Sequence, residues 1–210
     1  MKKALMSIFV IILLLGVLGF IYKAPLIEKA KEAITADMYV SADTDSFDPG
    51  TDVGQSFPKI DATYNGQNIS SLEGFAGEKG TIFVVSRSVV WCPYCMKQMH
   101  GLNEHLSEFE KAGIKLVGLT YDSPQDQKAF KNKYSINYPI LSDNNAASVI
   151  NLGILNEEYN PGEEAYGIGH PGAFVLDADG MIVGKVFIEA YSSRVDAESL
   201  LNYAESVLKR

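Results

Sequence analysis

The stretch that decides the fold is residues 81–95, which read TIFVVSRSVVWCPYC. It opens with the apolar, β-branched run of residues 81–86, and such a run predicts a strand that is buried on both faces. The strand is followed by Cys92 and Cys95, which are the only cysteines among 210 residues. Two cysteines separated by two residues can close a small disulfide ring and open it again. The spacing therefore predicts a redox-active dithiol, which we call the cysteine pair.

The cysteine pair is expected at the start of a helix that begins at Pro93 and ends near residue 111. Proline costs no hydrogen bond at the first helical position, because the N–H group there has no intrahelical partner. Cys92 would then lie at the helix N-terminus, where free N–H groups and the macrodipole favour a thiolate. We predict Cys92 as the nucleophile and Cys95, one turn further on, as the resolving thiol.

Segments of strand and helix pattern alternate along the rest of the chain. Strands are expected at residues 114–121, 138–141, 173–176 and 181–188, and helices at 123–134, 146–152 and 196–208. A turn at residues 177–180 joins the last two strands as an antiparallel hairpin. The pattern predicts an α/β sandwich, with a central mixed β-sheet flanked by helices. The cysteine pair then lies at the carboxyl end of a strand, where open α/β sheets place their sites.

Metal binding is the competing interpretation of the cysteine pair, with His100 and His105 as two further ligands. Successive residues of a helix are rotated by about 100°, so these four side chains would point in different directions around one helix. The spacing between cysteines and histidines is also far shorter than in a zinc finger. We therefore expect no metal and no other cofactor.

A second candidate feature is the segment Gly169-His170-Pro171-Gly172, which directly precedes the predicted strand 173–176. A proline that enters a strand can follow a cis peptide bond, and such a bond in a tight turn is usually functional. An ordinary trans loop is the alternative interpretation.

The N-terminal part of the chain predicts a membrane anchor. Residues 4–22 carry no charge, and at about 1.5 Å per residue a helix over them reaches roughly 28 Å, close to the thickness of a bilayer core. We expect an uncleaved anchor within residues 1–36; a cleaved signal peptide is the alternative, although bulky residues stand where cleavage needs small ones. Lys2 and Lys3 favour a cytoplasmic N-terminus. The cysteine pair would then face the periplasm or the cell exterior, where thiols tend to be oxidised.

The remaining chain is expected to form a linker and one domain. Residues 37–53 hold five aspartates and no Lys or Arg, which predicts a solvated acidic linker, with an acidic metal site as the alternative. Residues 54–210 are long enough for a single domain. The net charge of −8 argues against nucleic acid as a partner.

Together these features resemble the thioredoxin-fold superfamily and, within it, the peroxiredoxin-like redoxins of the alkyl hydroperoxide reductase/thiol-specific antioxidant (AhpC/TSA) branch. The resemblance covers about residues 53–208 and is carried by residues 54–58, 68–72, 91–95, 171, 174–177 and 180. It implies a thioredoxin-like fold, a cis peptide bond before Pro171 opposite the cysteine pair, and substrate binding by the backbone there. It implies supporting roles in the site for Trp91, Pro93, Tyr94, His170 and Pro171.

The chain departs from the peroxidases of this branch at their signature site. Those enzymes carry Pro-x-x-x-Thr/Ser-x-x-Cys, and neither cysteine fits that register. Counting back from Cys92, Val89 stands at the Thr/Ser position of the motif and Val85 at the Pro position. Counting back from Cys95, these positions hold Cys92 and Ser88. This mismatch argues against peroxidase activity.

Basic residues near the cysteine pair are the other departure. The branch's usual arginine before the late strand is missing, and His170 stands near that place. Arg87 and Lys97 flank the pair and could stabilise a Cys92 thiolate, although such residues more often face solvent. No feature of the sequence connects Arg194 with the site.

The sequence therefore favours a membrane-anchored thiol–disulfide oxidoreductase. In this interpretation Cys92 exchanges with a protein disulfide or dithiol partner, and Cys95 resolves the mixed disulfide. The alternative is a thiol peroxidase, in which Cys92 attacks a hydroperoxide and Cys95 condenses with the sulfenic acid. A metal carrier or a docking domain without catalytic activity is a third possibility.

Overall fold

The computed structural model describes residues 23, 25–42 and 46–209, in two compact units that divide between Asp37 and Met38. In the first unit residues 25–34 are helical, and the Thr35 hydroxyl donates a hydrogen bond to the Lys31 carbonyl (2.7 Å). Within the described ranges, every helix is too short or too polar to cross a membrane. The predicted anchor at residues 4–22 lies outside these ranges and stays a prediction.

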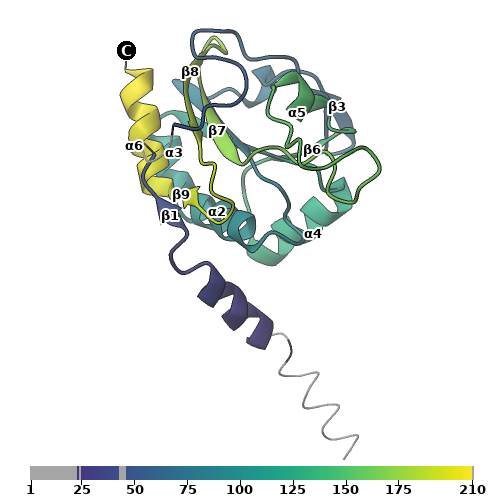
Figure 1. Cartoon of the computed structure of the whole chain (residues 1–210). Coiled ribbons are helices and arrows are strands. Elements are labelled where there is room, and N and C mark those ends of the chain that lie inside the picture. The colour runs from purple at the N-terminus through teal and green to yellow at the C-terminus, as the bar shows by residue number, and fades with distance from the viewer. Residues whose placement is uncertain (1–22, 24, 43–45, 210) are drawn as a thin grey trace, which may run out of the picture. The chain divides into compact units, whose positions relative to one another are not determined.

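The second unit is built on a seven-stranded sheet in the order β3-β2-β6-β5-β4-β7-β8 (Figure 1). The strands are β2 (Ala62–Tyr64), β3 (Gln67–Ile69), β4 (Gly80–Val85), β5 (Ile114–Thr120), β6 (Ile140–Asp143), β7 (Gly172–Asp177) and β8 (Ile182–Phe187). β4, β5 and β6 are parallel, whereas β7 is antiparallel to both β4 and β8. The predicted mixed sheet with a late antiparallel hairpin is confirmed.

Helices cover both faces of this sheet. They are η1 (Glu73–Phe75), α2 (Pro93–Glu104), α3 (Leu106–Lys111), α4 (Pro124–Tyr134), α5 (Ala147–Asn151) and α6 (Ala197–Leu208). Along β4, Ile82 and Val84 belong to the core cluster that includes residues of α2, α4 and α6. Phe83 and Val85 belong to the second cluster, which includes α5. The alternation places both faces of β4 in a core, as the apolar run predicts.

The helix predicted from Pro93 to about residue 111 is divided at His105, which was not expected. The imidazole Nδ1 of His105 lies 3.0 Å from the Gly101 carbonyl oxygen, which also accepts the His105 backbone N–H. The ring therefore shares a helical acceptor, and the backbone at His105 turns away from helical geometry (φ −98°, ψ 8°) before α3 begins.

Two very short strands form a second sheet that the sequence did not predict. β1 (Tyr39–Val40) runs parallel to β9 (Arg194–Val195), with Tyr39 opposite Arg194. Figure 1 shows the two strands side by side close to α2. The sheet joins the start of the second unit to the segment between β8 and α6.

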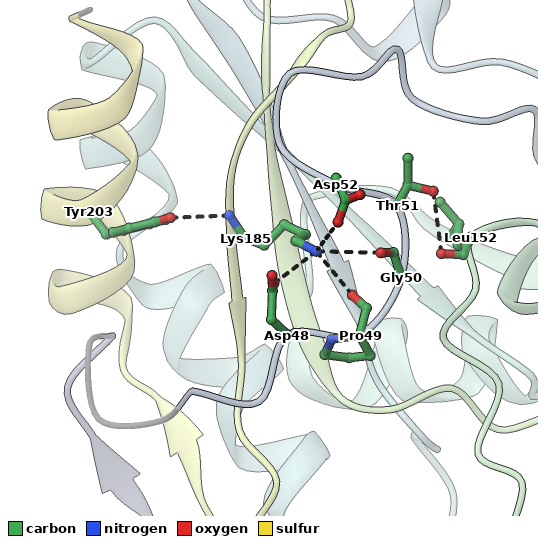
Figure 2. Close-up of polar contacts among 8 residues, drawn as sticks. All are labelled: Asp48, Pro49, Gly50, Thr51, Asp52, Leu152, Lys185 and Tyr203. Carbon is green, nitrogen blue, oxygen red and sulfur yellow. Dashed lines mark hydrogen bonds and ion pairs between the residues drawn. The ribbon is translucent and has the colours of Figure 1, made fainter.

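Residues 48–52 of the acidic segment contact β8, while the side chains of Asp48 and Asp52 stay largely exposed, at 64% and 75% (Figure 2). The ammonium group of Lys185 on β8 lies 2.8 Å from Asp48 and 4.0 Å from Asp52, and donates to the carbonyls of Pro49 and Gly50 at 3.4 Å. The side chain of Lys185 is only 3% exposed. Asp48 and Asp52, two of the five aspartates considered for an acidic metal site, therefore contact Lys185. A buried ammonium requires such partners, and that need explains the docking.

Candidate active site

The loop between β4 and α2 is fixed by one buried carboxylate. Asp122, just after β5, accepts hydrogen bonds from the Ser88 hydroxyl (2.6 Å) and the Val89 amide (2.7 Å). The Ser88 oxygen in turn accepts the amide N–H groups of Val90 (2.9 Å) and Trp91 (3.3 Å). Burial raises the pKa of Asp122, while these hydrogen bonds oppose the shift.

Sequence reasoning missed Asp122, although a signal was present. An acid directly after a buried parallel strand lies at the same sheet edge as the cysteine pair. The carboxylate holds the chain that leads into Cys92, and so it positions the start of α2.

The structure places Cys92 as the N-cap residue of α2, as the sequence predicted. Its sulfur accepts a hydrogen bond from the Cys95 amide (3.3 Å), and Pro93 occupies the first turn. The two sulfur atoms lie 2.6 Å apart, and both cysteines are free thiols. Both are fully buried, with 0% exposure. The pair can therefore exchange a proton or close a disulfide with little movement.

Arg194 on β9 completes the site, which the sequence did not indicate. Its guanidinium Nη2 lies 3.2 Å from the Cys95 sulfur and 3.8 Å from the Cys92 sulfur. Its Nη1 donates to the carbonyls of Tyr191 (3.1 Å) and Ser193 (2.5 Å). The side chain is 2% exposed, so its charge acts on the sulfurs without much screening by water.

The environment separates the proton affinities of the two thiols. Burial opposes ionisation of Cys95, but the hydrogen bond from Cys92 and the charge of Arg194 outweigh it and hold the pKa of Cys95 well below its usual range. The same hydrogen bond, followed by burial, raises the pKa of Cys92. The pair therefore loses its first proton readily and its second with difficulty.

Aromatic side chains and a second arginine surround the cysteine pair. Trp91 donates its indole N–H to the Tyr121 hydroxyl (2.8 Å), and the rings of Tyr94 and Tyr191 meet edge to face, 6.0 Å between centroids. Arg87 stacks 3.7 Å above the Tyr191 ring and donates to the Tyr191 carbonyl. The expectation that Arg87 faces solvent is wrong, because Arg87 is 3% exposed and packs against the ring of Tyr191.

Tyr191 belongs to residues 188–193, which connect β8 with β9 and which we call the capping loop. The pKa of Tyr191 is raised by its partial burial and, to a smaller extent, by the two nearby cysteines. The loop is held by both arginines through one carbonyl oxygen, that of Tyr191. Lys97, the other basic residue considered from the sequence, lies with its ammonium 5.7 Å from the centre of the Tyr39 ring.

The structure separates the two residues of the second candidate feature. Pro171 lines a small cavity of about 10 Å³ together with Gln98 and Arg194. The His170 ring instead packs against Phe47, 5.0 Å between centroids, and burial lowers its pKa.

The prediction of a cis peptide bond before Pro171 is wrong, because all peptide bonds of the described residues are trans. Gly172 already pairs with Val85 and Phe187 in the sheet, so the backbone enters β7 in an extended conformation.

His100 of α2 and His105, which follows the helix, contact partners other than the cysteine pair. His100 Nδ1 lies 3.5 Å from the Glu104 carboxylate, and His105 contacts the Gly101 carbonyl. Over the described part of the chain, the side chains of His, Cys, Asp and Glu form no cluster of three or more that could hold a metal ion.

Comparison with known proteins identifies the family. Residues 53–185 match the AhpC/TSA family. Peroxiredoxin Bcp of Escherichia coli K12 is 30% identical over 112 residues, which are 53% of this chain and 70% of that protein. The chloroplastic peroxiredoxin Q of Suaeda salsa is 26% identical over 145 residues, which are 68% of this chain and 62% of that protein.

Solved structures share the fold. A peroxiredoxin-like protein from Aquifex aeolicus superposes with a TM-score of 0.64 at 18% identity, covering 76% of this chain and 90% of that one. Reduced Prx3 from Vibrio vulnificus gives a TM-score of 0.62 at 17% identity, covering 76% of this chain and 99% of that one. The fold, the cysteine pair and the sequence match agree: the chain belongs to the AhpC/TSA family of thioredoxin-fold proteins and is a thiol-based oxidoreductase.

Proposed function

We propose that this protein is a thiol peroxidase that reduces hydroperoxides with the Cys92–Cys95 pair. The observation that carries the proposal is the guanidinium of Arg194, buried 3.2 Å from the Cys95 sulfur, which favours a thiolate where a peroxide would be attacked. Similarity to peroxiredoxins over most of the domain supports it. This proposal puts the alternative interpretation of the sequence ahead of disulfide exchange.

The contacts reverse the roles expected for the two cysteines. Cys95 is nearer the guanidinium and receives the hydrogen bond of the Cys92 thiol, so Cys95 is the attacking sulfur in this proposal. Its thiolate attacks one peroxide oxygen, the O–O bond breaks, and the alkoxide or hydroxide leaves and takes up a proton. The Cys95 sulfenic acid then reacts with the Cys92 thiol, which forms the disulfide and releases water. An external dithiol restores the reduced pair.

The burial of both sulfurs restricts the substrate. With 0% exposure, neither sulfur can meet a folded protein without movement of its surroundings. A small hydroperoxide needs a smaller opening than a protein disulfide does. The arrangement therefore favours hydrogen peroxide and small organic hydroperoxides as substrates.

The proposal is tested with the reduced protein and the two serine variants, mixed rapidly with hydrogen peroxide. Cys92→Ser should still consume one peroxide and accumulate a sulfenic acid on Cys95, detected by a dimedone adduct. Cys95→Ser should react no faster than an ordinary thiol. An adduct on Cys92 in Cys95→Ser, formed at the wild-type rate, would contradict the assignment.

Thiol–disulfide exchange is the second candidate, and one observation favours it. Cys92 caps the helix, and its neighbours Val90 and Trp91 are exposed at the surface, where a partner chain could bind. Rapid exchange with a protein disulfide, together with peroxide oxidation no faster than that of a simple thiolate, would make this the main function.

We further propose, from the sequence, that residues 4–22 anchor the protein and that the domain faces away from the cytoplasm. Alkaline phosphatase fused after Arg210 should then be active. An inactive fusion that is present at normal levels would contradict this orientation.

A further inference from the structure

The arginine of the site comes from outside the part of the chain that matches the family. That match covers residues 53–185, whereas β1, the capping loop and β9 all lie beyond it. Arg194 nevertheless contacts both sulfurs. The surroundings of the cysteine pair are therefore completed by segments that lie outside the matched residues.

β9 depends on β1 for the position of Arg194 itself. The backbone N–H of Arg194 donates to the Met38 carbonyl (2.8 Å), and Tyr39 and Val40 lie opposite Arg194 and Val195. Without this partner the Arg194 N–H would lose its acceptor, which would destabilise the position of β9.

β1 is itself fastened to the helix that carries the cysteine pair. The Met38 side chain is 2% exposed, and the Tyr39 hydroxyl donates to the Lys97 carbonyl on α2 (3.4 Å). On the other side of β9, Gln98 of α2 donates to the Val195 carbonyl (3.0 Å). β9 thus lies between two attachments, of which β1 with the preceding Met38 is the one that pairs with the backbone of Arg194.

We propose that β1 is a positioning element of the active site: by pairing with β9 it holds the Arg194 guanidinium against the cysteine sulfurs. Weakening β1 lets β9 and the capping loop move, which withdraws the positive charge from the pair. The reactivity of the dithiol is then set by residues 38–40, more than fifty positions before it in the chain. The inference rests on the proposed function only where it concerns the rate of peroxide oxidation. The thiolate itself can be observed without any peroxide.

The test follows thiolate ultraviolet absorbance against pH in the reduced full-length chain. Arg194→Gln should raise the first pKa of the pair by about one unit or more, because an opposite charge close to an ionised group typically shifts it by that much. Met38→Asn places an amide at the buried position just before β1 and should shift the pKa in the same direction. Ser41→Asn adds the same side chain at an exposed position just after β1 and should leave the pKa unchanged.

The double variant separates positioning from general damage. If β1 acts through the arginine, Met38→Asn added to Arg194→Gln should raise the pKa no further. Thermal unfolding of each variant checks folding, and Met38→Ala, which removes packing without burying a polar group, replaces Met38→Asn if that variant does not fold. The inference would be overturned if the first pKa of the pair kept its wild-type value in Met38→Asn and Met38→Ala but was shifted in Arg194→Gln.

The peroxide reaction is measured on the same variants. Slower oxidation in Met38→Asn that matches its loss of thiolate supports the inference. Shifted titrations in a protein that never reacts rapidly with peroxide would leave the role of β1 intact and contradict the peroxidase function alone.

Discussion

Two side chains distant in sequence from the cysteine pair determine its chemistry: Arg194 supplies charge and Asp122 fixes the approach to Cys92. The helix N-terminus, which the sequence does predict, favours a thiolate at Cys92. The arginine lies nearer to Cys95, and a full charge at 3.2 Å outweighs the partial charge of a helix end. Together with the hydrogen bond from the Cys92 thiol, this contact is the physical reason for which we propose Cys95 as the attacking sulfur.

The shared proton predicts a characteristic pH dependence of stability for the reduced protein. Between the lowered pKa of Cys95 and the ordinary thiol value of about 8.5, the unfolded chain keeps a proton that the folded chain has lost. Stability rises with pH wherever the unfolded state binds more protons, so it should rise across this window. Above it, folded Cys92 keeps a proton that the unfolded chain has released, and stability should fall.

Urea unfolding under reducing conditions at a series of pH values measures this dependence. Each unit of pKa shift corresponds to about 1.4 kcal/mol. In Cys95→Ser both the rise and the fall should largely disappear. Parallel curves for the two proteins would show that the thiols do not interact as described.

A substitution at Ser88 measures how much the hydrogen bonds around Asp122 contribute to the free energy of unfolding. Ser88→Ala leaves an Asp122 oxygen and the amides of Val90 and Trp91 without their partner, so we expect a loss of about 1–3 kcal/mol and slower peroxide oxidation. Ser86 provides a matched control, because its hydroxyl is also buried but has no hydrogen-bond partner among the described residues. Ser86→Ala should be close to neutral, and an equal loss in both variants would contradict the network.

At the scale of elements, periodic segments were predictable and short paired ones were not. The apolar run at residues 81–86 corresponds to β4, and residues 114–121 correspond to β5 within one residue. β1 and β9 contain two residues each, which is too few for a pattern to show. They form because their backbones pair across more than 150 positions, and no local feature reports such pairing.

The same reasoning explains the docked segment before residue 53. Five aspartates in a short stretch indicate a solvated linker, but Lys185 on β8 supplies the counter-charge. Because Lys185 is an isolated lysine in an alternating strand, its burial could not be recognised from the sequence.

Lys185 makes the docking testable. Lys185→Met keeps the length of the side chain but removes the ammonium group that the carbonyls of Pro49 and Gly50 share. We expect faster amide hydrogen exchange over residues 47–53, including the Thr51 amide that bonds to Leu152. The control is Lys115→Met, which changes an exposed lysine of β5. Unchanged exchange in Lys185→Met would show that the segment docks without the lysine.

At the scale of the molecule, residues 53–185 form the core that matches the family, and segments added to it along the chain contribute to its active site. The core supplies the sheet, α2 and the cysteine pair, whereas β1, the capping loop and β9 supply Arg194 and the Tyr191 cover. A predicted membrane anchor precedes the unit to which these additions belong. Arg194 lies about 100 positions after the cysteine pair and reaches it only through the fold, which explains why the sequence did not reveal it.

The most direct test of the account is the second-order rate constant for oxidation of the reduced full-length protein by hydrogen peroxide. It is compared with that of a free thiol of matched pKa and with that of Arg194→Gln. The account predicts a wild-type rate far above that of the free thiol and a loss of about tenfold or more in Arg194→Gln at a pH below the thiol pKa. A wild-type rate equal to that of the free thiol, unchanged by Arg194→Gln, would contradict it.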